Sequence, residues 1–317
     1  MKKVFLLQIA VVAITILCCI FSTKYIIRFV PDDYDRLYNI NKWMQNPDIK
    51  PDMIFFGSSE AMNCVNGDLI KQEYNIDAVS YSNTGQQLAE AFLFYSKVPK
   101  STKTVVQVIR AGSLTDDGYI NDVKANRLII DGYKLDDFTK GMLKEKTLEK
   151  MSKSVPEACF DIRGYLKNGF HSYLRELLEP GQYCDSSNTY IRNAYMFNYE
   201  RAPQDQYDKL LHSLEIEVAQ NLVVNKDMVN KIRKAGDYFK GRGIQYVLVL
   251  SPVSSNASHI VPPDSKSVIE NLQFDFPVFD YTNLLDESGF ADPVHPNRKG
   301  AKIFTSQFMN DFIKLNK

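Results

Sequence analysis

A histidine follows an aspartate by three residues in the stretch DPVHPNRKG. The chain has four histidines, and this one, His295, lies near Asp292 where a helix is expected to begin. A carboxylate can hold an imidazole in one tautomer, and the ring can then take a proton from a weak nucleophile. The pair therefore predicts general-base chemistry, if another part of the chain supplies a hydroxyl. The same residues also suit a surface loop with a hydrogen-bonded structural histidine.

The candidate hydroxyl is that of Ser59, in the stretch FFGSSEA. The apolar residues before Gly57 are typical of a short buried strand, and the residues after Ser59 have helical spacing. Backbone N–H groups at such a turn are not used inside the helix, so they can stabilise a negative oxygen on a substrate. Ser59 is therefore a candidate nucleophile with His295 as its base. A serine here is also a common helix N-cap, which needs no chemistry.

Two further strand-to-turn units carry polar or small residues. The stretch YSNTGQQL contains Asn83 and Gly85, and the stretch VIRAGSL contains Ser113. Gly85 has no side chain, so a substrate oxygen could approach its backbone N–H. Asn83 is a weaker candidate for substrate contact, and Asn-Thr-Gly is ordinarily a turn. Ser113 is a candidate for an additional hydrogen-bond donor.

Strands alternate with helices on both sides of a long interruption. The expected strands are DMIFF, IDAVS, TKTVVQVI, IQYVLVL and FPVFDY. Such alternation predicts right-handed crossovers, and hence an α/β fold with a flavodoxin-like, doubly wound parallel sheet. Ligands bind beyond the carboxyl ends of strands in these sheets. The serine, glycine, aspartate and histidine candidates should therefore converge at that edge.

The interruption spans about residues 120–222 and is expected to be a mostly helical insertion. Its tyrosine-rich part suggests a lid or a glycan platform, or packing within a helical subdomain. A helix is expected after it, with Asn225 as the N-cap, and a terminal helix with Asn297 as the N-cap behind Pro296.

The N-terminal run VFLLQIAVVAITILCCIF is roughly as long as a bilayer-spanning helix. We expect residues 1–30 to form a cytoplasmic tip and an uncleaved signal anchor, because Lys2 and Lys3 precede the run. Residues 31–50 would form a stalk, and residues 51–317 an extracytoplasmic α/β domain on a single-pass membrane protein. A cleaved signal peptide and a buried core helix are the alternatives.

The charge balance bears on nucleic acid as a partner, and the cysteines and histidines bear on metals and disulfides. Lys plus Arg and Asp plus Glu both total 38, so the zero formal net charge argues against nucleic acid as a partner. No Cys or His spacing matches a metal site, and we expect neither a metal nor a cofactor. A disulfide between Cys159 and Cys184 is compatible with an oxidising compartment. Cys64 is expected to be a packing residue, with a reactive thiol as the alternative.

The remaining histidines carry less signal. His171 and His212 lie in helical stretches and are expected to be structural or surface residues. His259 follows the strand IQYVLVL at the predicted ligand edge of the sheet, so it is a candidate for substrate contact.

The motifs together resemble a known family. FFGSSEA, YSNTGQQL and DPVHPNRKG are similar to the first, second and last conserved blocks of the SGNH/GDSL hydrolases. Gly-Ser-Ser in place of Gly-Asp-Ser, together with a single N-terminal span, resembles the membrane-anchored members that acylate envelope polymers. These members include the alginate O-acetylation and teichoic-acid D-alanylation proteins. The resemblance covers residues 50–120 and 223–317.

The resemblance implies roles for particular residues. Ser59 would be the nucleophile, His295 the base and Asp292 its partner, and the N–H groups of Ser59 and Gly85 would contribute to an oxyanion hole. The sequence departs from the family at the third block, where Gly-x-Asn-Asp is usual and VIRAGSLTDD has no asparagine. Either Ser113 or Thr115 completes the hole, or the hole has two members and hydrolysis is slow.

The resulting expectation is a membrane-anchored serine esterase or acyltransferase that acts on an envelope or capsular glycan. An acyl group would pass through Ser59 to a sugar hydroxyl or to water, without a cofactor. Transfer would require an integral-membrane partner that carries the acyl group. The rival expectations are a glycan acetyl-ester hydrolase and a non-catalytic protein that uses the fold for glycan binding or assembly.

Overall fold

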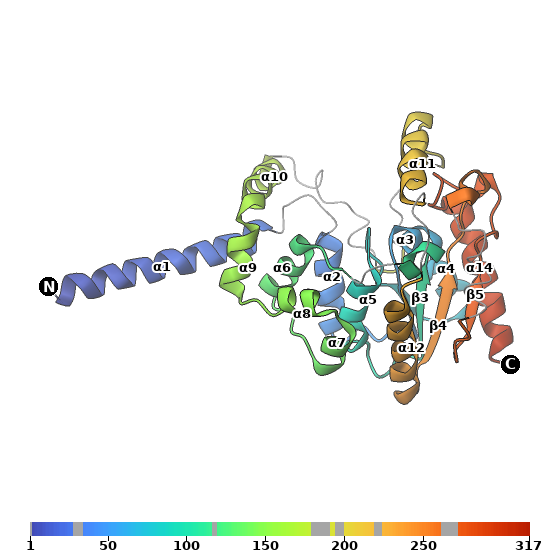
Figure 1. Ribbon diagram of the computed structural model, residues 1–317, viewed down its shortest axis with the longest axis horizontal. Coiled ribbons are helices and arrows are strands. Elements are labelled where there is room, and N and C mark those ends of the chain that lie inside the picture. Colours follow the sequence, from blue (N-terminus) through green and yellow to red (C-terminus); the bar gives the residue numbers. More distant parts are fainter. Residues whose placement is uncertain are drawn as a thin grey trace.

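A five-stranded parallel sheet forms the centre of the molecule. The computed structural model describes residues 2–27, 34–115, 119–178, 191–193, 200–218, 224–260 and 272–317. The strands are β1 (Met53–Phe56), β2 (Ala78–Ser80), β3 (Thr104–Ile109), β4 (Gln245–Leu250) and β5 (Val278–Asp280). They pair in parallel in the order β2-β1-β3-β4-β5, which is the flavodoxin-like order. The predicted α/β class with a parallel sheet is confirmed (Figure 1).

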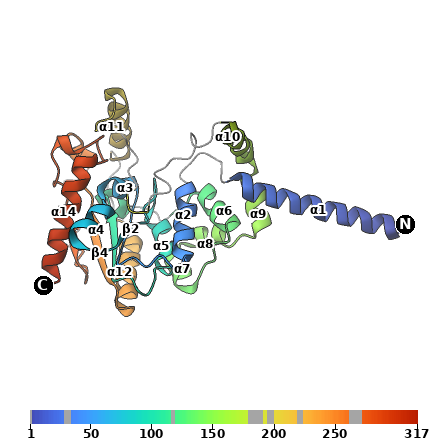
Figure 2. The same cartoon turned by 180° about the vertical axis from the view of Figure 1, so that it is seen from behind.

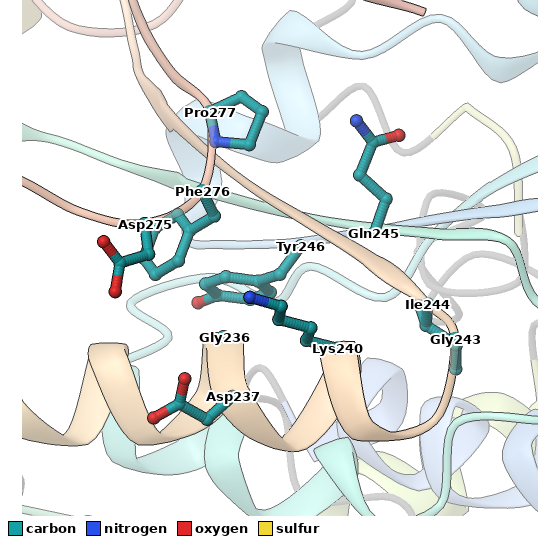
Figure 3. A pocket seen from close by; sticks show the side chains of 10 residues that line it. All are labelled: Gly236, Asp237, Lys240, Gly243, Ile244, Gln245, Tyr246, Asp275, Phe276 and Pro277. Carbon is teal, nitrogen blue, oxygen red and sulfur yellow. The ribbon is translucent and has the colours of Figure 1, made fainter.

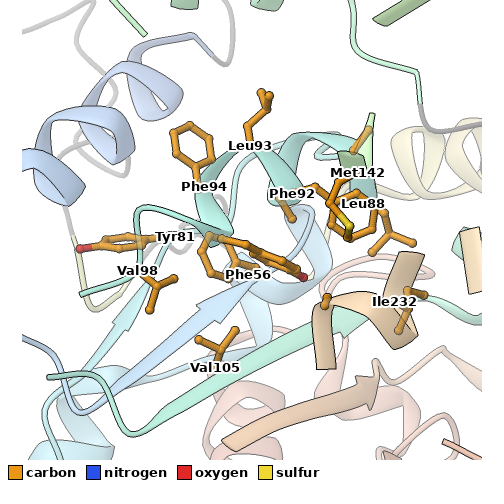
Figure 4. Close-up of a cluster of buried hydrophobic side chains, with 14 of the residues drawn as sticks. Phe56, Tyr81, Leu88, Phe92, Leu93, Phe94, Val98, Val105, Met142 and Ile232 are labelled. Atoms are coloured by element: carbon orange, nitrogen blue, oxygen red, sulfur yellow. The ribbon is translucent and has the colours of Figure 1, made fainter. Parts of the chain in front are cut away.

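Helices cover both faces of the sheet, because successive strand residues point to opposite sides. Phe55 and Val106 pack with residues of α3, α4 and α14 on one face, whereas Phe56 and Val105 pack with residues of α5 and α12 on the other. Figure 4 shows part of the second cluster, in which aromatic rings of α5 lie over Phe56. The helices are α3 (Ser59–Cys64), α4 (Gly67–Tyr74), α5 (Leu88–Tyr95), α12 (Lys226–Gly241) and α14 (Arg298–Leu315).

The helices near the candidate site differ in one respect from the expected pattern. Residues 60–74 were expected to continue as helix after the serine, but the structure divides them into α3 and α4. The break occurs because the Asn66 side chain accepts a hydrogen bond from the Leu69 N–H and starts a new helix. The predicted N-caps Asn225 and Asn297 are confirmed, since each side chain accepts hydrogen bonds from the first turn of its helix.

The N-terminal helix α1 (Lys2–Ile26) projects from the rest of the molecule (Figures 1 and 2). Its segment Val4–Ile26 is long and apolar enough to cross a membrane. Membrane anchors and signal sequences share this length and composition, so the uncleaved anchor stays a prediction. The end of the helix is nevertheless packed, because Ile27 is buried and joins a cluster with residues of α6 and α9.

Between β3 and β4 the described residues are mainly helical, as expected for the insertion. The helices are α6 (Asp122–Ile130), α7 (Asp137–Met142), α8 (Glu145–Met151), α9 (Val155–Ile162), α10 (Leu166–Leu178) and α11 (Gln204–Val218), and α12 follows. Cys159 is buried on α9. Cys184 lies outside the described residues, as does most of the tyrosine-rich stretch, so the disulfide stays a prediction.

Residues 34–50, the described part of the expected stalk, do not form a spacer between the membrane helix and the domain. They contain α2 (Tyr34–Gln45), whose residues Leu37 and Ile40 are fully buried in the core. Arg36 is also fully buried, and its guanidinium donates to the carbonyls of Ser80 and Ser82 at 2.6 and 2.5 Å. These carbonyls lie at the last residue of β2 and two residues beyond it, so α2 is part of the α/β domain rather than a spacer. This role could not be predicted from the sequence, because the partners of Arg36 lie more than 40 residues away.

We predict that Arg36→Met lowers the free energy of unfolding by about 2–4 kcal/mol, because two buried carbonyls lose a charged donor. Lys42→Met, at an exposed position on the same helix, should change it by less than about 0.5 kcal/mol. Denaturant unfolding of the detergent-solubilised chain measures both values. Equal stability of the two variants would show that α2 does not support the sheet.

Candidate active site

The structure brings Ser59, His295 and Asp292 into one hydrogen-bonded chain. Ser59 is the first residue of α3, directly after the turn that follows β1, and the other two lie in the loop before α14. The Ser59 Oγ lies 2.7 Å from His295 Nε2. The other ring nitrogen, Nδ1, lies 2.8 Å from both carboxylate oxygens of Asp292. Residues 236 positions apart therefore meet at hydrogen-bond distance.

The chemistry of these groups fixes the direction of the hydrogen bonds. An ionised carboxylate only accepts, so the Nδ1–H of His295 donates to Asp292. The Nε2 atom then carries a lone pair and accepts from the Ser59 hydroxyl. Asp292 is 4% exposed, and its Oδ1 also accepts from the backbone N–H groups of Val294 and His295. The carboxylate is thus held by its own loop in the position that orients the imidazole.

Asn297 holds the loop that carries His295. Its Oδ1 accepts from the Gly300 N–H, and its Nδ2 donates to the carbonyls of Ser288, Phe290 and Glu200. A short antiparallel bridge between Phe290 and Pro296 closes the loop. An asparagine side chain can do this because it has both an acceptor and two donors.

Gly300 allows a close approach in the same region. A Cβ at this position would overlap the carbonyl oxygen of Gly289. The spacing His-Pro-Asn-x-x-Gly therefore has a mechanical explanation, since Asn297 ties the loop and Gly300 lets it lie against α14.

The turn that precedes Ser59, Gly57–Ser58, is held by the loop after β2. The Gly57 N–H donates to Gln86 Oε1 at 2.9 Å, and the Gly57 carbonyl accepts from the Asn83 N–H at 3.0 Å. A Cβ on Gly57 would lie 2.6 Å from the carbonyl oxygen of Val108 and 2.5 Å from the Ala61 Cβ. Only glycine fits where β1 runs so close to β3. This contact fixes where α3 starts, and hence where Ser59 lies.

Two neighbouring serines have different partners. The Ser58 hydroxyl donates to a carboxylate oxygen of Glu60, whereas Ser59 meets His295. Glu60 is buried, and its other oxygen lies 3.8 Å from a guanidinium nitrogen of Arg110. The acidic side chain is therefore engaged away from the imidazole. The geometry distinguishes Ser59 from Ser58 as the hydroxyl with a base.

Gly85 lies in an exposed turn rather than at the start of a helix. It has a φ of 57°, and α5 begins three residues later, at Leu88. Lys124 of α6 reaches this turn, where its Nζ lies 3.1 Å from the Thr84 carbonyl and 3.1 Å from Glu90 Oε1. Glu90 is 1% exposed and the Lys124 side chain 12%. Lys124 of the insertion, in a buried ion pair with Glu90 of α5, thus fixes the peptide that joins Thr84 to Gly85.

The third strand ends without an asparagine, as the sequence indicated. Arg110 follows β3, and the 3-10 helix Ala111–Thr115 comes next. The Ser113 N–H donates to the Arg110 carbonyl at 2.9 Å, so this N–H is already used within the turn. The side chain of Thr115 lies outside the described residues. Of the Ser113 donors, its hydroxyl is left for a substrate.

The other predicted residues fall at different places. Asn83 is fully buried, and its side-chain amide has no hydrogen-bond partner among the described residues. His259 lies in the 3-10 helix Ser255–Ile260 after β4, and its side chain is not described. His171 and His212 are exposed on α10 and α11.

Cys64 is fully buried at the end of α3, and its carbonyl accepts from the Thr305 hydroxyl of α14. Burial, with a smaller contribution from Glu60, raises the pKa of the Cys64 thiol well above its ordinary value. A protonated, inaccessible thiol supports the packing role rather than the reactive one.

The insertion contacts the histidine loop directly. The Ala202 N–H donates to the Ala291 carbonyl, and Leu210 and Leu211 of α11 pack on a small cluster that includes Val294. These contacts were not predictable from local sequence patterns, because they join segments about 90 residues apart.

A second set of contacts holds the loop after β4 beside the histidine loop. Glu287 accepts from the hydroxyls of Ser254 and Ser255 and from the Asn256 N–H. Burial opposes ionisation of Glu287, but these donors hold the pKa of its carboxyl below the ordinary value. The Ser254 N–H donates to the Pro293 carbonyl, which lies between Asp292 and His295.

A cavity of about 290 Å³ lies elsewhere (Figure 3). It is lined by the C-terminal half of α12, the first residues of β4, and the segment Asp275–Pro277 before β5. It therefore opens at the amino ends of the strands, on the edge opposite Ser59 and His295. We assign no role to it.

Among the described residues, no group of three or more His, Cys, Asp or Glu side chains could hold a metal ion. The absence of a metal requirement stays a prediction. In comparisons with known proteins, no family model and no curated protein sequence matches the chain. The family resemblance therefore rests on the motifs and on the geometry alone.

Sequence reasoning missed several residues that support the candidate site. They are Gln86, Glu60, Arg110, Glu90 and Lys124. Gln86 and Glu60 lie inside the quoted motifs, so their positions beside Gly85 and Ser59 were a usable signal. Lys124 and Glu90 gave no such signal, because two residues 34 positions apart form no recognisable local pattern.

We predict that Asn297→Asp lowers the free energy of unfolding by about 2–4 kcal/mol. Aspartate keeps the helix cap, but it loses the donors and places a charge against three carbonyls. Asn66→Asp is the matched control, because the Asn66 side chain caps α4 by accepting from Leu69. Thermal or denaturant unfolding of both variants measures the difference. A similar loss at both positions would refute the proposed role of the amide donors.

We also predict that Lys124→Met lowers the free energy of unfolding by about 3–5 kcal/mol, because it leaves Glu90 buried without this cation. Adding Glu90→Leu should recover most of the loss. Lys97→Met removes a more exposed pair with Asp136 and should cost no more than about 1 kcal/mol. A double variant that is no more stable than Lys124→Met would contradict this account.

Proposed function

We propose that this protein is a membrane-anchored serine esterase or acyltransferase of the SGNH type, with Ser59, His295 and Asp292 as its catalytic triad. The observation that carries the proposal is the hydrogen-bond chain from Asp292 through His295 to the Ser59 hydroxyl. A hydroxyl paired with an oriented imidazole is the arrangement that activates serine for attack on an ester. Its place at the carboxyl ends of parallel strands, where such sheets bind ligands, supports the same reading.

The proposed reaction has two stages. The Ser59 oxygen attacks the ester carbonyl carbon while its proton moves to His295 Nε2, and Asp292 stabilises the imidazolium. The alcohol leaves with that proton, and an acyl ester remains on Ser59. A sugar hydroxyl or water then loses its proton to His295 and attacks the acyl carbon. The bond to the Ser59 oxygen breaks, and His295 returns the proton to that oxygen. The protein's own groups supply every proton transfer, so the proposal needs no cofactor.

Negative charge on the carbonyl oxygen needs donors. The Ser59 N–H is at the first position of α3, where no intrahelical partner exists, so it is one proposed donor. The Gly85 N–H is the second, and Lys124 fixes its peptide. The buried amide of Asn83, in the loop bonded to Gly57, is a candidate for a substrate contact, because a bound oxygen would satisfy its Nδ2. The Ser113 hydroxyl remains a further candidate.

We propose an envelope or capsular glycan as the acceptor or the acylated substrate. The proposed location is a single-pass anchor with the α/β domain outside the cytoplasm. The run of apolar residues in α1 and the basic residues before it support this topology. Packing of Ile27 against the insertion supports an anchor that is retained in the mature protein. Transfer rather than hydrolysis would require an integral-membrane partner, because acyl donors are cytoplasmic.

The test is reaction of the detergent-solubilised chain with a small activated acetyl ester, followed by intact-mass analysis and product release. Ser59→Ala should abolish the acetyl adduct and lower turnover at least about 10³-fold, because the nucleophile is lost. Ser58→Ala is the matched control, since it removes the adjacent hydroxyl that contacts Glu60, and it should still be acetylated.

The products then separate the candidate functions. Acetylated sugar in the presence of added glycans would indicate transfer, and acetate alone would indicate a hydrolase. If the wild type and Ser59→Ala are equally unlabelled, the triad is not catalytic. The fold would then serve glycan binding or assembly.

A further inference from the structure

Large apolar side chains are exposed in one region outside α1. In the part of the chain that the structure describes, nine such side chains beyond α1 are exposed, and six of them lie between residues 160 and 178. They are Phe160, Tyr165, Phe170, Leu174, Leu177 and Leu178, and we call them the α9–α10 apolar surface. Their exposed fractions range from 41% at Leu174 to 81% at Leu178. Soluble surfaces rarely concentrate apolar residues in this way without a partner.

The sequence of α10 explains why this surface is continuous. Phe170, Leu174 and Leu177 are spaced by four and three residues, so they form one stripe on the helix. Lys167 and Arg175 are exposed beside the stripe. The result is an amphipathic helix with an apolar face and a basic edge, which is the pattern of helices that lie in a membrane interface.

The stripe does not face the core of the protein. The buried side of α10 is formed by other residues, since Leu166 packs on the cluster that contains Ile27. The rings of Tyr173 and Tyr25 meet edge to face, with centroids 5.6 Å apart. Tyr173 is three residues after Phe170 and four before Leu177, so it lies next to both on the helix surface. The exposed stripe therefore begins directly beside α1.

The position of α1 identifies what covers this surface. Both views show α9 and α10 beside the C-terminal end of α1, with the sheet on the far side of the insertion (Figures 1 and 2). The apolar residues of α1 are themselves exposed along its length, so the helix needs a lipid environment. A membrane that surrounds α1 ends near Tyr25, at the level of the α9–α10 apolar surface. Tyrosine is enriched at that depth, and basic residues there attract anionic headgroups.

We propose that α10 lies in the membrane interface beside α1, with Phe170, Leu174 and Leu177 between the headgroups and the acyl chains. The protein then contacts the bilayer through the insertion as well as through α1. This inference rests on retention of α1 as an anchor, which is part of the function proposed above, but it does not depend on the chemistry of Ser59.

The test uses the full chain in vesicles of phosphatidylcholine and phosphatidylglycerol, with and without brominated acyl chains that quench tryptophan. Trp43 is the single native tryptophan, and it packs in the core, so it provides a constant background. Leu174→Trp and Leu177→Trp add reporters at exposed positions. They should lose about half or more of the added emission, because interfacial helices bury their apolar face roughly 5–10 Å into the boundary region.

Two further variants make the result decisive. Asp208→Trp, at an exposed position on α11, should show no quenching of the added emission. Leu17→Trp reports insertion of α1 itself and should be strongly quenched. If Leu17→Trp is quenched while Leu174→Trp and Leu177→Trp behave like Asp208→Trp, the apolar surface faces a protein partner or a second copy, and the proposal is wrong. If Leu17→Trp is not quenched, the anchor fails and the proposal fails with it, whatever the ester assay shows.

Discussion

The hydrogen bond between Ser59 and His295 depends on the alignment of the first strand with the last helix. Ser59 and His295 are 236 positions apart, so no local contact holds them together. Thr305 of α14 provides a direct connection. Its hydroxyl donates to the Cys64 carbonyl at the end of α3 and accepts from the Asn66 N–H. Together with the aromatic packing of Phe308 on Phe55, this contact holds α14 against α3, the helix that begins with Ser59. Packing in the core therefore sets the positions of α3 and α14, and the loops after β2 and before α14 fix the side chains of the site within that frame.

The insertion joins this alignment to the proposed membrane surface. One end of it packs on α1 through Ile129, Ile162 and their neighbours. Its first helix places Lys124 at the turn that contains Gly85, and Ala202, just before α11, bonds the histidine loop. The segment that interrupts the α/β pattern is therefore a structural bridge rather than an appendage.

The sequence was most informative where structure is local or periodic. Buried strands, the caps Asn225 and Asn297, and the candidate triad could all be identified, because strand ends in a parallel sheet must share an edge. The packing of α2 could not, since Arg36 binds carbonyls on a distant loop. The break at Asn66 was missed because helical spacing continues through it. The Lys124–Glu90 pair depends on tertiary contact between α6 and α5. Local pattern thus predicted the candidate triad better than the residues that position it.

Ser59 and His295 are far apart in the sequence, and this separation matters while the chain is being translated. Ser59 is made long before His295, by roughly ten to fifty seconds at ordinary rates of translation. Throughout that interval the hydroxyl exists without its imidazole, and Gly57 has no β3 to lie against until residues 104–109 are complete. If the chain crosses the membrane behind α1 while it is still being translated, Ser59 crosses before it has a base and is therefore unreactive. If the protein acts as proposed above, reactivity towards esters would arise only once α14 has docked and brought His295 to Ser59.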